Sequence, residues 1–239
     1  MKGLLVAIQF LTRLPTPRIT VSSGEFAASM RWFPAVGLIV GALVAGAGWA
    51  GAQIDPWTGA LGALIVWVVV TGALHLDGLG DIADASGAAH KDRERLLAVL
   101  SDPHIGSFGA VAIGLQLVAK LVLLHALLDR NAFVAIALVP FAARVGPLVW
   151  SRTLPDLHPG LGSRFRHSVR PIDFMVWSLL LVAAAWASPS LLAAPLVVLL
   201  WGRWLLHKIG GISGDGHGAG IEVSESLLLA AALLPAYVI

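Results

Sequence analysis

The sequence predicts an all-α, polytopic integral membrane protein with about seven transmembrane helices. Of its 239 residues, 57% are hydrophobic and only 13% are charged, whereas soluble domains contain about 25% charged residues. The apolar residues form long blocks of the length that crosses a bilayer. Thirteen of the sixteen Lys and Arg residues fall on one side if the N-terminus is cytoplasmic. We therefore expect a single membrane domain over 1–239, with the N-terminus and the long polar loops in the cytoplasm.

The first third of the chain predicts an interfacial helix and two spans. An apolar run favours a short helix over 3–12 lying in the membrane interface, and the prolines of TRLPTP end it. The first span is expected over 33–54, where Gly37 and Gly41 form a small-xxx-small pair that permits close approach of another helix. The second span is expected over 57–75, and it leads directly into an acidic stretch.

Polar segments separate the remaining spans. The sequence DRERLLAVL, within 88–103, predicts a short amphipathic helix at the surface. An arginine-rich loop over 151–172 and a glycine-rich loop over 208–221 are expected on the same, cytoplasmic side. The remaining spans are expected over 106–128, 131–150, 173–187, 190–207 and 222–239, the last of them only marginally long enough.

The acidic stretch, HLDGLGDIADASG at 75–87, is the first candidate for chemistry. Asp77, Asp81 and Asp84 are spaced i, i+4 and i+7, so a helix would place them on one face. Like charges this close repel, and carboxylates with this spacing suit Mg²⁺, which prefers hard oxygen ligands together with substrate phosphates. Gly78 would leave room for a substrate beside the backbone. The alternative is a solvated, charged helix end.

The segment SDPHIGSFGA, 101–110, is the second candidate. Asp102 precedes a span, so it either caps that helix or acts as a general base. His104 either donates to a phosphate, acts as a base, or is structural. Gly106 lies where backbone N–H groups at a helix start would face a phosphate.

The third candidate is GDGHGAGIEVSE, 214–225. Gly214, Asp215 and His217 lie in the expected glycine-rich loop before the last span, where backbone N–H groups can bind a phosphate. An ordinary flexible loop is the alternative. Glu222 and Glu225 then enter an apolar span, which costs a few kcal/mol each unless they have partners.

Arginines supply candidate phosphate contacts. Arg144 lies inside the fourth expected span between Pro140 and Pro147, which predict a kink. An arginine at that depth needs a partner, either a phosphate or one of the Asp and Glu side chains. Arg13, in FLTRLPTP, lies near the same membrane face.

These parts favour phosphoryl-type transfer at the cytoplasmic membrane face. In that chemistry the protein mainly positions groups and neutralises charge. The chain contains no cysteine, which excludes thiolate chemistry, and its low net charge of +2 favours no nucleic-acid partner. An ion-coupled secondary transporter using the Asp cluster is the alternative, but it predicts inverted repeats, and the sequence contains no such repeat. A structural membrane subunit would leave the acidic loops unexplained.

Five motifs together resemble the cobalamin synthase family, the adenosylcobinamide-GDP ribazoletransferases. They are FLTRLPTP at 10–17, FPAVG at 33–37, HLDGLGDIADASGA at 75–88, RERLLAVLSDPHIGSFGA at 93–110, and GDGHGA with IEVSE at 214–225. They run in the family's order over almost the full length. The acidic segment alone is also loosely similar to CDP-alcohol phosphotransferases.

The resemblance implies the last assembly step of the cobalamin nucleotide loop. The substrates would be adenosylcobinamide-GDP and α-ribazole or its 5′-phosphate, with release of GMP. The resemblance also implies Mg²⁺ dependence, a multi-pass location in the bacterial inner membrane, and either a homo-oligomer or association with other cobamide-assembly enzymes. By motif position, Asp77, Asp81 and Asp84 match the metal and pyrophosphate residues, and Asp102 and Asp215 fall in the other acidic motifs.

This sequence departs from the family pattern at several positions. Gly80, Ile82 and Ala85 replace the usual Ala, Thr and Gly of the acidic segment, but the aspartates are kept. Pro103 and His104 stand where the family more often has Ser and Arg. A phosphate contact from His104 would therefore require a protonated imidazole.

Overall fold

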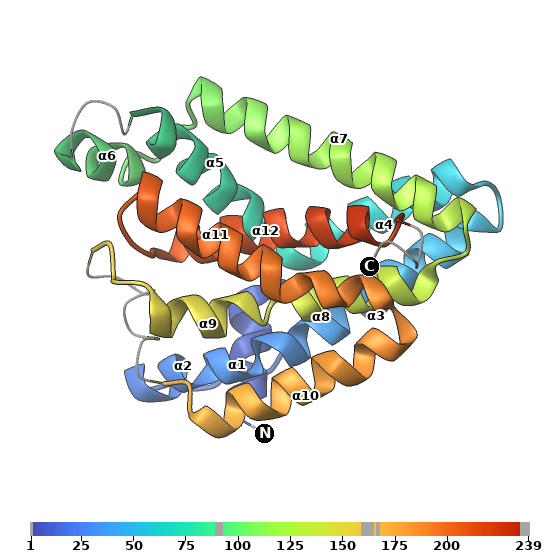
Figure 1. The fold of residues 1–239 in the computed structure, drawn as a ribbon, viewed down its shortest axis with the longest axis horizontal. Helices are drawn as coiled ribbons and strands as arrows, with labels where there is room; N and C mark the ends of the chain where they lie inside the picture. Colours follow the sequence, from blue (N-terminus) through green and yellow to red (C-terminus); the bar gives the residue numbers. More distant parts are fainter. Residues whose placement is uncertain (1, 89–92, 159–164, 166–167, 235–239) are drawn as a thin grey trace.

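The computed structural model describes residues 2–88, 93–158, 165 and 168–234, and its regular elements within these ranges are helices (Figure 1). The α-helices are α1 Lys2–Leu11, α2 Ser23–Ser29, α3 Phe33–Ala52, α4 Pro56–Thr71, α5 Leu74–Ala88, α6 Arg93–Leu100, α7 Ser107–Asp129, α8 Phe133–Ala143, α9 Gly146–Thr153, α10 Pro171–Ala187, α11 Ala194–Lys208 and α12 Gly214–Ala231. Two short 3₁₀ helices, η1 Met30–Trp32 and η3 Pro189–Ala193, precede α3 and α11. The predicted all-α class is confirmed.

Four stretches are long and apolar enough to cross a membrane, counted over the described residues. They are Ser23–Ala52, Ser107–Asp129, Phe133–Thr153 and Pro189–Lys208. The bent pair of α4 and α5 makes a fifth if it is counted as one span. Of the remaining expected spans, α10 has only 17 residues, and α12 contains Asp215, Glu222 and Glu225. Length and composition therefore support four or five of the seven expected spans.

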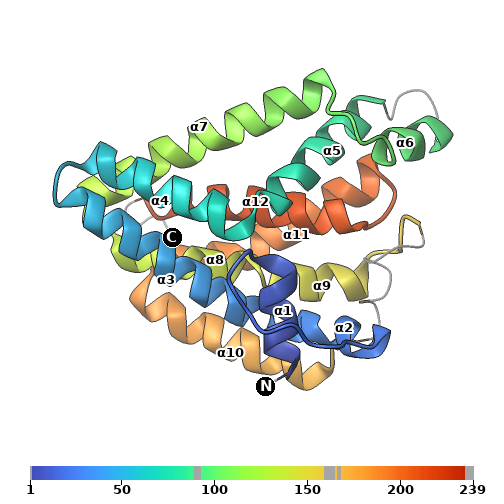
Figure 2. The same ribbon diagram turned by 180° about the vertical axis from the view of Figure 1, so that it is seen from behind.

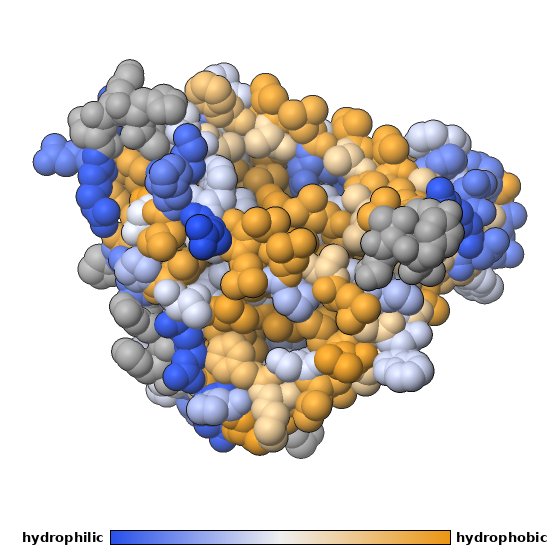
Figure 3. Space-filling view, viewed as in Figure 1, coloured by the Kyte–Doolittle hydropathy of each residue, from blue (hydrophilic) through white to orange (hydrophobic). Residues whose placement is uncertain are grey.

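Polar and apolar side chains are segregated along the molecule. Figure 3 shows hydrophobic side chains across the middle and hydrophilic side chains gathered at the two ends. One end carries α5 and α6, and the other carries the α3–α4 and α7–α8 connections (Figures 1 and 2). We call the first the acidic end, defined by α5, α6 and the first turns of α12.

The second expected span, 57–75, is not one straight helix. It ends at Gly72 and Ala73, which both adopt left-handed backbone conformations with φ of 61° and 58°, and α5 leaves α4 at an angle of 84°. The side chain of Arg13 lies against Gly72, where a Cβ would collide with it. The bend makes the acidic stretch a separate helix that lies against α12.

The glycine-rich loop expected over 208–221 ends earlier than predicted. The Ser213 hydroxyl caps α12 by accepting a hydrogen bond from the Gly216 N–H at 3.0 Å, so GDGHGAG forms the first turns of that helix. Glycine is a poor helix former in isolation, but tertiary packing overrides this preference here. A Cβ at Gly218 would contact His75, and one at Gly220 would collide with Trp150. α12 packs against α5, α7, α8, α9 and α11 and is thus the central helix.

Two packing predictions are confirmed. A Cβ at Gly37 or Gly41 would collide with the backbone of α8, so the small-xxx-small pair brings α3 and α8 into close contact. The kink expected around Arg144 is also present, because α8 ends at Ala143 and α9 begins at Gly146.

Candidate functional site

The three aspartates of the acidic stretch lie on one helix, as their spacing predicted. α5 spans Leu74–Ala88 and contains Asp77, Asp81 and Asp84. Gly78 lets α12 approach so closely that a Cβ there would collide with the backbone of Asp215. Asp215, 137 positions after Gly78 in the sequence, therefore joins the carboxylates of α5.

Asp81 lies at the centre of this acidic group. Its side chain is half-buried, and the charges of Asp215, Asp77 and Asp84 act on it in the same, repulsive sense. Repulsion between partly buried carboxylates is stronger than at a solvated surface because the local dielectric is lower. A cation bound here would relieve that repulsion.

Asp84 has a structural role. Its two carboxylate oxygens accept hydrogen bonds from the backbone N–H groups of Gly106, at 2.7 Å, and Gly109, at 2.9 Å. Asp84 therefore supplies the cap of α7, whose own cap residue is a glycine with no side chain to do so. This ties the segment 101–106 to α5, and it uses the Gly106 N–H that we expected to face a phosphate.

Asp215 lies in the first turn of α12, close to His158. Burial raises the pKa of the Asp215 carboxyl above its ordinary value; hydrogen bonds from its own backbone N–H and from the Ser213 hydroxyl, and then the charge of His158, partly counteract this. A carboxylate with a raised pKa holds a transferred proton more readily than an ordinary one. His158 was not among the predicted site residues; it comes from the arginine-rich loop.

Asp77 and Asp215 line one side of a cavity of about 170 Å³. Asp77 and Gly214 are exposed and form its rim together with Asp215. The other lining side chains are buried or apolar: Phe10, Leu11, Met30, Phe33, Leu74, His75, Phe165, His217 and Ile221. The predicted residues Asp77, Gly214, Asp215 and His217 thus meet at one place.

Asp102 and His104 lie apart from this cavity and pair with each other. The Asp102 carboxylate accepts hydrogen bonds from the His104 backbone N–H at 3.0 Å and contacts the His104 ring at 2.7 Å. Their side chains are 54% and 87% exposed. These hydrogen bonds lower the pKa of Asp102, which makes it a weaker base than Asp215. Arg13, at the α4–α5 bend, does not line the cavity either.

Arg144 is fully buried and paired with a carboxylate, one of the two partners expected for it. It donates to Glu225 at 2.8 Å, and Lys120 lies 2.6 Å from Glu225 and 2.7 Å from Glu222. Gln116 also donates to Glu222. The expectation that Glu222 and Glu225 need partners is confirmed, and each charge of this network lies against an opposite charge within the protein. Nε and Nη2 of Arg144 have no hydrogen-bond partner among the described residues.

Three or more His, Cys, Asp or Glu side chains do not come together in a metal-binding arrangement anywhere in the described part of the chain. A Mg²⁺ ion does not require such an arrangement, because it usually keeps several waters and binds one or two carboxylates plus substrate phosphates. The oxygen donors of Asp77, Asp81 and Asp215 are of the chemical type that Mg²⁺ prefers.

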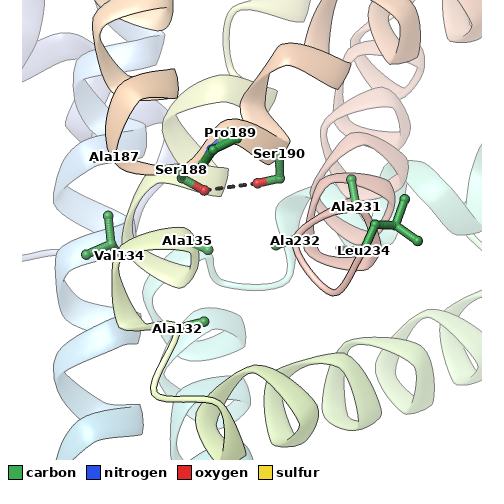
Figure 4. Close-up of a pocket in the computed structure, with 10 residues that line it drawn as sticks. All are labelled: Ala132, Val134, Ala135, Ala187, Ser188, Pro189, Ser190, Ala231, Ala232 and Leu234. Carbon is green, nitrogen blue, oxygen red and sulfur yellow. Dashed lines mark hydrogen bonds between the residues drawn. The ribbon is translucent and has the colours of Figure 1, made fainter. Parts of the chain in front are cut away.

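A second cavity of about 240 Å³ lies at the end opposite the acidic end, between α8, η3 and α12 (Figure 4). Ser188 and Ser190 hydrogen-bond to each other at 2.9 Å across its upper side in that view. Its other lining residues are alanines, Val134, Pro189 and Leu234. It contains no carboxylate, imidazole or basic group and is not a candidate for the transfer chemistry.

The sequence interpretation overlooked the apolar part of the site. Phe10 and Phe33 open two of the motifs quoted above, FLTRLPTP and FPAVG, and His75 opens the acidic stretch. In the sequence, each of these residues is equally compatible with a place in the apolar core or at a helix end, so none of them by itself indicated a site. Their position at motif boundaries was the available signal that they belong to a site.

Comparison with known proteins gives a consistent result. Residues 3–233 match the family described as cobalamin-5-phosphate synthase. The chain is 65% identical to the adenosylcobinamide-GDP ribazoletransferase of Novosphingobium aromaticivorans, over 96% of this chain and 95% of that protein. It is 48% identical to the enzyme of that name from Thiobacillus denitrificans (96% and 94%) and 34% identical to the one from Brevibacillus brevis (96% and 96%). No solved structure matches it.

Proposed function

The chain belongs to the cobalamin-5-phosphate synthase family of adenosylcobinamide-GDP ribazoletransferases, and we propose that its transfer reaction takes place at the rim formed by Asp77, Asp81 and Asp215. The observation that carries this proposal is the contact of α5 with α12 at Gly78, which brings Asp77 and Asp215 to the mouth of one cavity. Asp81, one turn after Asp77 on α5, is close enough for the charges of both to act on it. Membership of this family favours the transferase over the ion-coupled transporter and the CDP-alcohol type of phosphotransferase.

Asp77 and Asp81 would hold Mg²⁺ at this rim. The ion would neutralise the pyrophosphate of adenosylcobinamide-GDP. Asp84 would not bind the ion; it would hold the 101–106 segment against α5 through its hydrogen bonds from Gly106 and Gly109. The first turn of α12, beginning at Gly214, offers backbone N–H groups and a positive helix end to a phosphate. Arg13, at the α4–α5 bend, is a further candidate phosphate contact.

Asp215 is the better candidate for the general base, because it lines the cavity and Asp102 does not. A hydroxyl of α-ribazole, or of its 5′-phosphate, attacks the phosphorus next to cobinamide. The new phosphorus–oxygen bond forms as the bond to the bridging oxygen breaks, and GMP leaves with that oxygen. The hydroxyl proton passes to Asp215. The raised pKa of Asp215 favours this transfer.

The reaction site would face the cytoplasm. The sequence predicts most of the Lys and Arg residues on the cytoplasmic side of an inner membrane, and two of these residues, Arg93 and Arg95, lie on α6 at the acidic end. The N-terminal helix α1 would lie on the same side. This orientation would give the carboxylates access to water-soluble nucleotides and Mg²⁺.

GMP release from adenosylcobinamide-GDP, α-ribazole and Mg²⁺ in purified membranes tests the proposal. Asp81→Asn should abolish release without loss of membrane insertion, and Asp215→Asn should slow it by about 10²–10⁴-fold. Glu94→Gln is the matched control, because Glu94 is an exposed carboxylate on α6 at the same end. Asp102→Asn should also retain most activity. Full activity of Asp81→Asn at ordinary Mg²⁺ concentration would contradict the proposal.

A further inference from the structure

The cavity behind the acidic rim has an aromatic wall that the transfer chemistry does not use. Phe10, Phe33 and Phe165 converge on it from α1, α3 and the segment after α9. The ring centroids of Phe10 and Phe33 lie 5.9 Å apart, and those of Phe33 and Phe165 lie 5.8 Å apart. Phe33 and Phe165 are each only 2% exposed. The cavity therefore has an apolar, aromatic lining, which suits an aromatic ligand.

Two buried histidines also line the cavity without a hydrogen-bond partner. His75 is 2% exposed and His217 is 5% exposed. Neither nitrogen of either ring has a partner among the described residues. Buried polar groups are normally satisfied, and burial favours the neutral imidazole, which offers one donor and one acceptor. Two unsatisfied imidazoles in one cavity therefore indicate a ligand with polar groups.

The cavity size restricts that ligand. A dry protein cavity of about 150 Å³ holds a benzene molecule, so about 170 Å³ accommodates one small aromatic ring system. The corrin macrocycle of the other substrate is far too large to enter. It must remain outside the rim, where Asp77 and Gly214 are exposed.

We propose that this cavity binds the aromatic base of α-ribazole, with Phe10, Phe33 and Phe165 contacting the ring and His75 and His217 hydrogen-bonding its polar atoms or the ribose. This inference rests on the proposed function, since it names the acceptor subsite of the same site. It leaves the ribose at the rim, next to Asp215. The base inside and the hydroxyl at the carboxylates would then position the acceptor for attack.

The guanine of adenosylcobinamide-GDP is the competing flat heterocycle. Guanine carries a carbonyl, an amino group and ring N–H and nitrogen atoms around its edge. An apolar wall with two imidazoles would leave several of these unsatisfied, which is unfavourable. The benzo ring of a benzimidazole base has an apolar edge and matches the wall better.

Direct binding of labelled α-ribazole tests the inference without turnover. The enzyme in membranes is treated with EDTA and given no corrinoid substrate. We expect saturable binding that free benzimidazole displaces and that GMP does not. Displacement by GMP but not by benzimidazole would assign the cavity to guanine and overturn the inference.

Phe33→Ala should weaken α-ribazole binding at least tenfold, and Phe26→Ala is its matched control. Phe26 packs against Phe10 and Phe165, with ring centroids 5.1 and 5.3 Å away, but it does not line the cavity. Equal weakening in both variants would indicate a general loss of packing and contradict the inference. His75→Phe, which puts a somewhat larger aromatic ring without nitrogens in place of the imidazole, should raise KM for α-ribazole and leave KM for adenosylcobinamide-GDP unchanged; equal rises in both would count against the assignment.

The two proposals fail in different ways. Asp81→Asn should still bind α-ribazole although it does not release GMP. If wild-type membranes release GMP but α-ribazole binding does not depend on Phe33 or His75, only the subsite is wrong. If α-ribazole binds as described but Asp81→Asn transfers normally, the subsite stands and the assignment of the acidic rim fails.

Discussion

At the residue scale, a network of buried charges stabilises the helix that carries part of the candidate site. Lys120, Arg144, Glu222 and Glu225 form two cations and two anions with side chains at most 3% exposed. Removing one member of a buried pair leaves an uncompensated charge, which costs about 3–5 kcal/mol. Since Glu222 and Glu225 lie on α12, this network fixes the helix that also carries Asp215.

Single and double variants test the network. Arg144→Leu and Glu225→Leu should each lower the free energy of unfolding by about 3–5 kcal/mol. The double variant should lose less than either, because it removes one charge of each sign and leaves the Lys120–Glu222 pair intact. Chemical unfolding in detergent measures this.

The exposed ion pair of Lys2 with Glu25, 2.6 Å apart, is the control, and Lys2→Met should leave unfolding unchanged. A double variant whose loss equals the sum of the single losses would show that the charges act independently.

At the element scale, glycines decide how closely the helices pack. Gly37 and Gly41 bring α3 onto α8, and Gly78 brings α5 onto α12. The last of these contacts assembles the site, because it places Asp215 beside the carboxylates of α5. Gly218 and Gly220 in turn let the glycine-rich start of α12 pack as a helix against His75 and Trp150.

Gly41→Ala tests the α3–α8 contact. Its Cβ would collide with the carbonyl of Ala137, so the free energy of unfolding should fall by about 1–3 kcal/mol. Gly46→Ala is the control on the same helix, since a Cβ there meets no atom of the described residues within 4 Å. Alanine should leave stability at that position unchanged or raise it by about 0.5–1 kcal/mol. Similar losses of stability in both variants would contradict this prediction, because the loss would then not depend on the contact with α8.

At the scale of the whole molecule, polar residues at the two ends enclose an apolar middle (Figure 3). The candidate site residues Asp77, Asp81 and Asp215 lie at the acidic end, whereas the other end is formed by the α3–α4 and α7–α8 connections (Figure 1). This asymmetry suits an enzyme that works at one membrane face.

Cysteine labelling tests the orientation, because the chain has no cysteine of its own. Ser101→Cys, exposed at the acidic end, should react with an impermeant maleimide only in inverted membrane vesicles. Gln53→Cys, exposed at the opposite end, should react only in intact cells or spheroplasts. Labelling with the opposite pattern would place the site outside the cytoplasm.

Local sequence patterns predicted a substantial part of this protein. The spacing of Asp77, Asp81 and Asp84 predicted one helix face, because helical periodicity depends only on neighbours along the chain. The burial cost of a charge predicted partners for Glu222, Glu225 and Arg144 before those partners were identified. The motif order predicted the family.

The arrangement of the site depended on contacts between distant segments. The 84° bend after Thr71 interrupts an apolar run that was expected to be one span; Gly72 adopts the left-handed conformation readily, whereas Ala73 adopts it against its preference. The helical start of α12 contradicts the local expectation of a loop, because packing against His75 and Trp150 outweighs the low helix propensity of glycine. The aromatic cavity joins residues from Phe10 to Ile221. Periodicity and propensity describe neighbours in the chain, whereas a cavity forms from the way separate helices pack, and that is a property of the folded molecule alone.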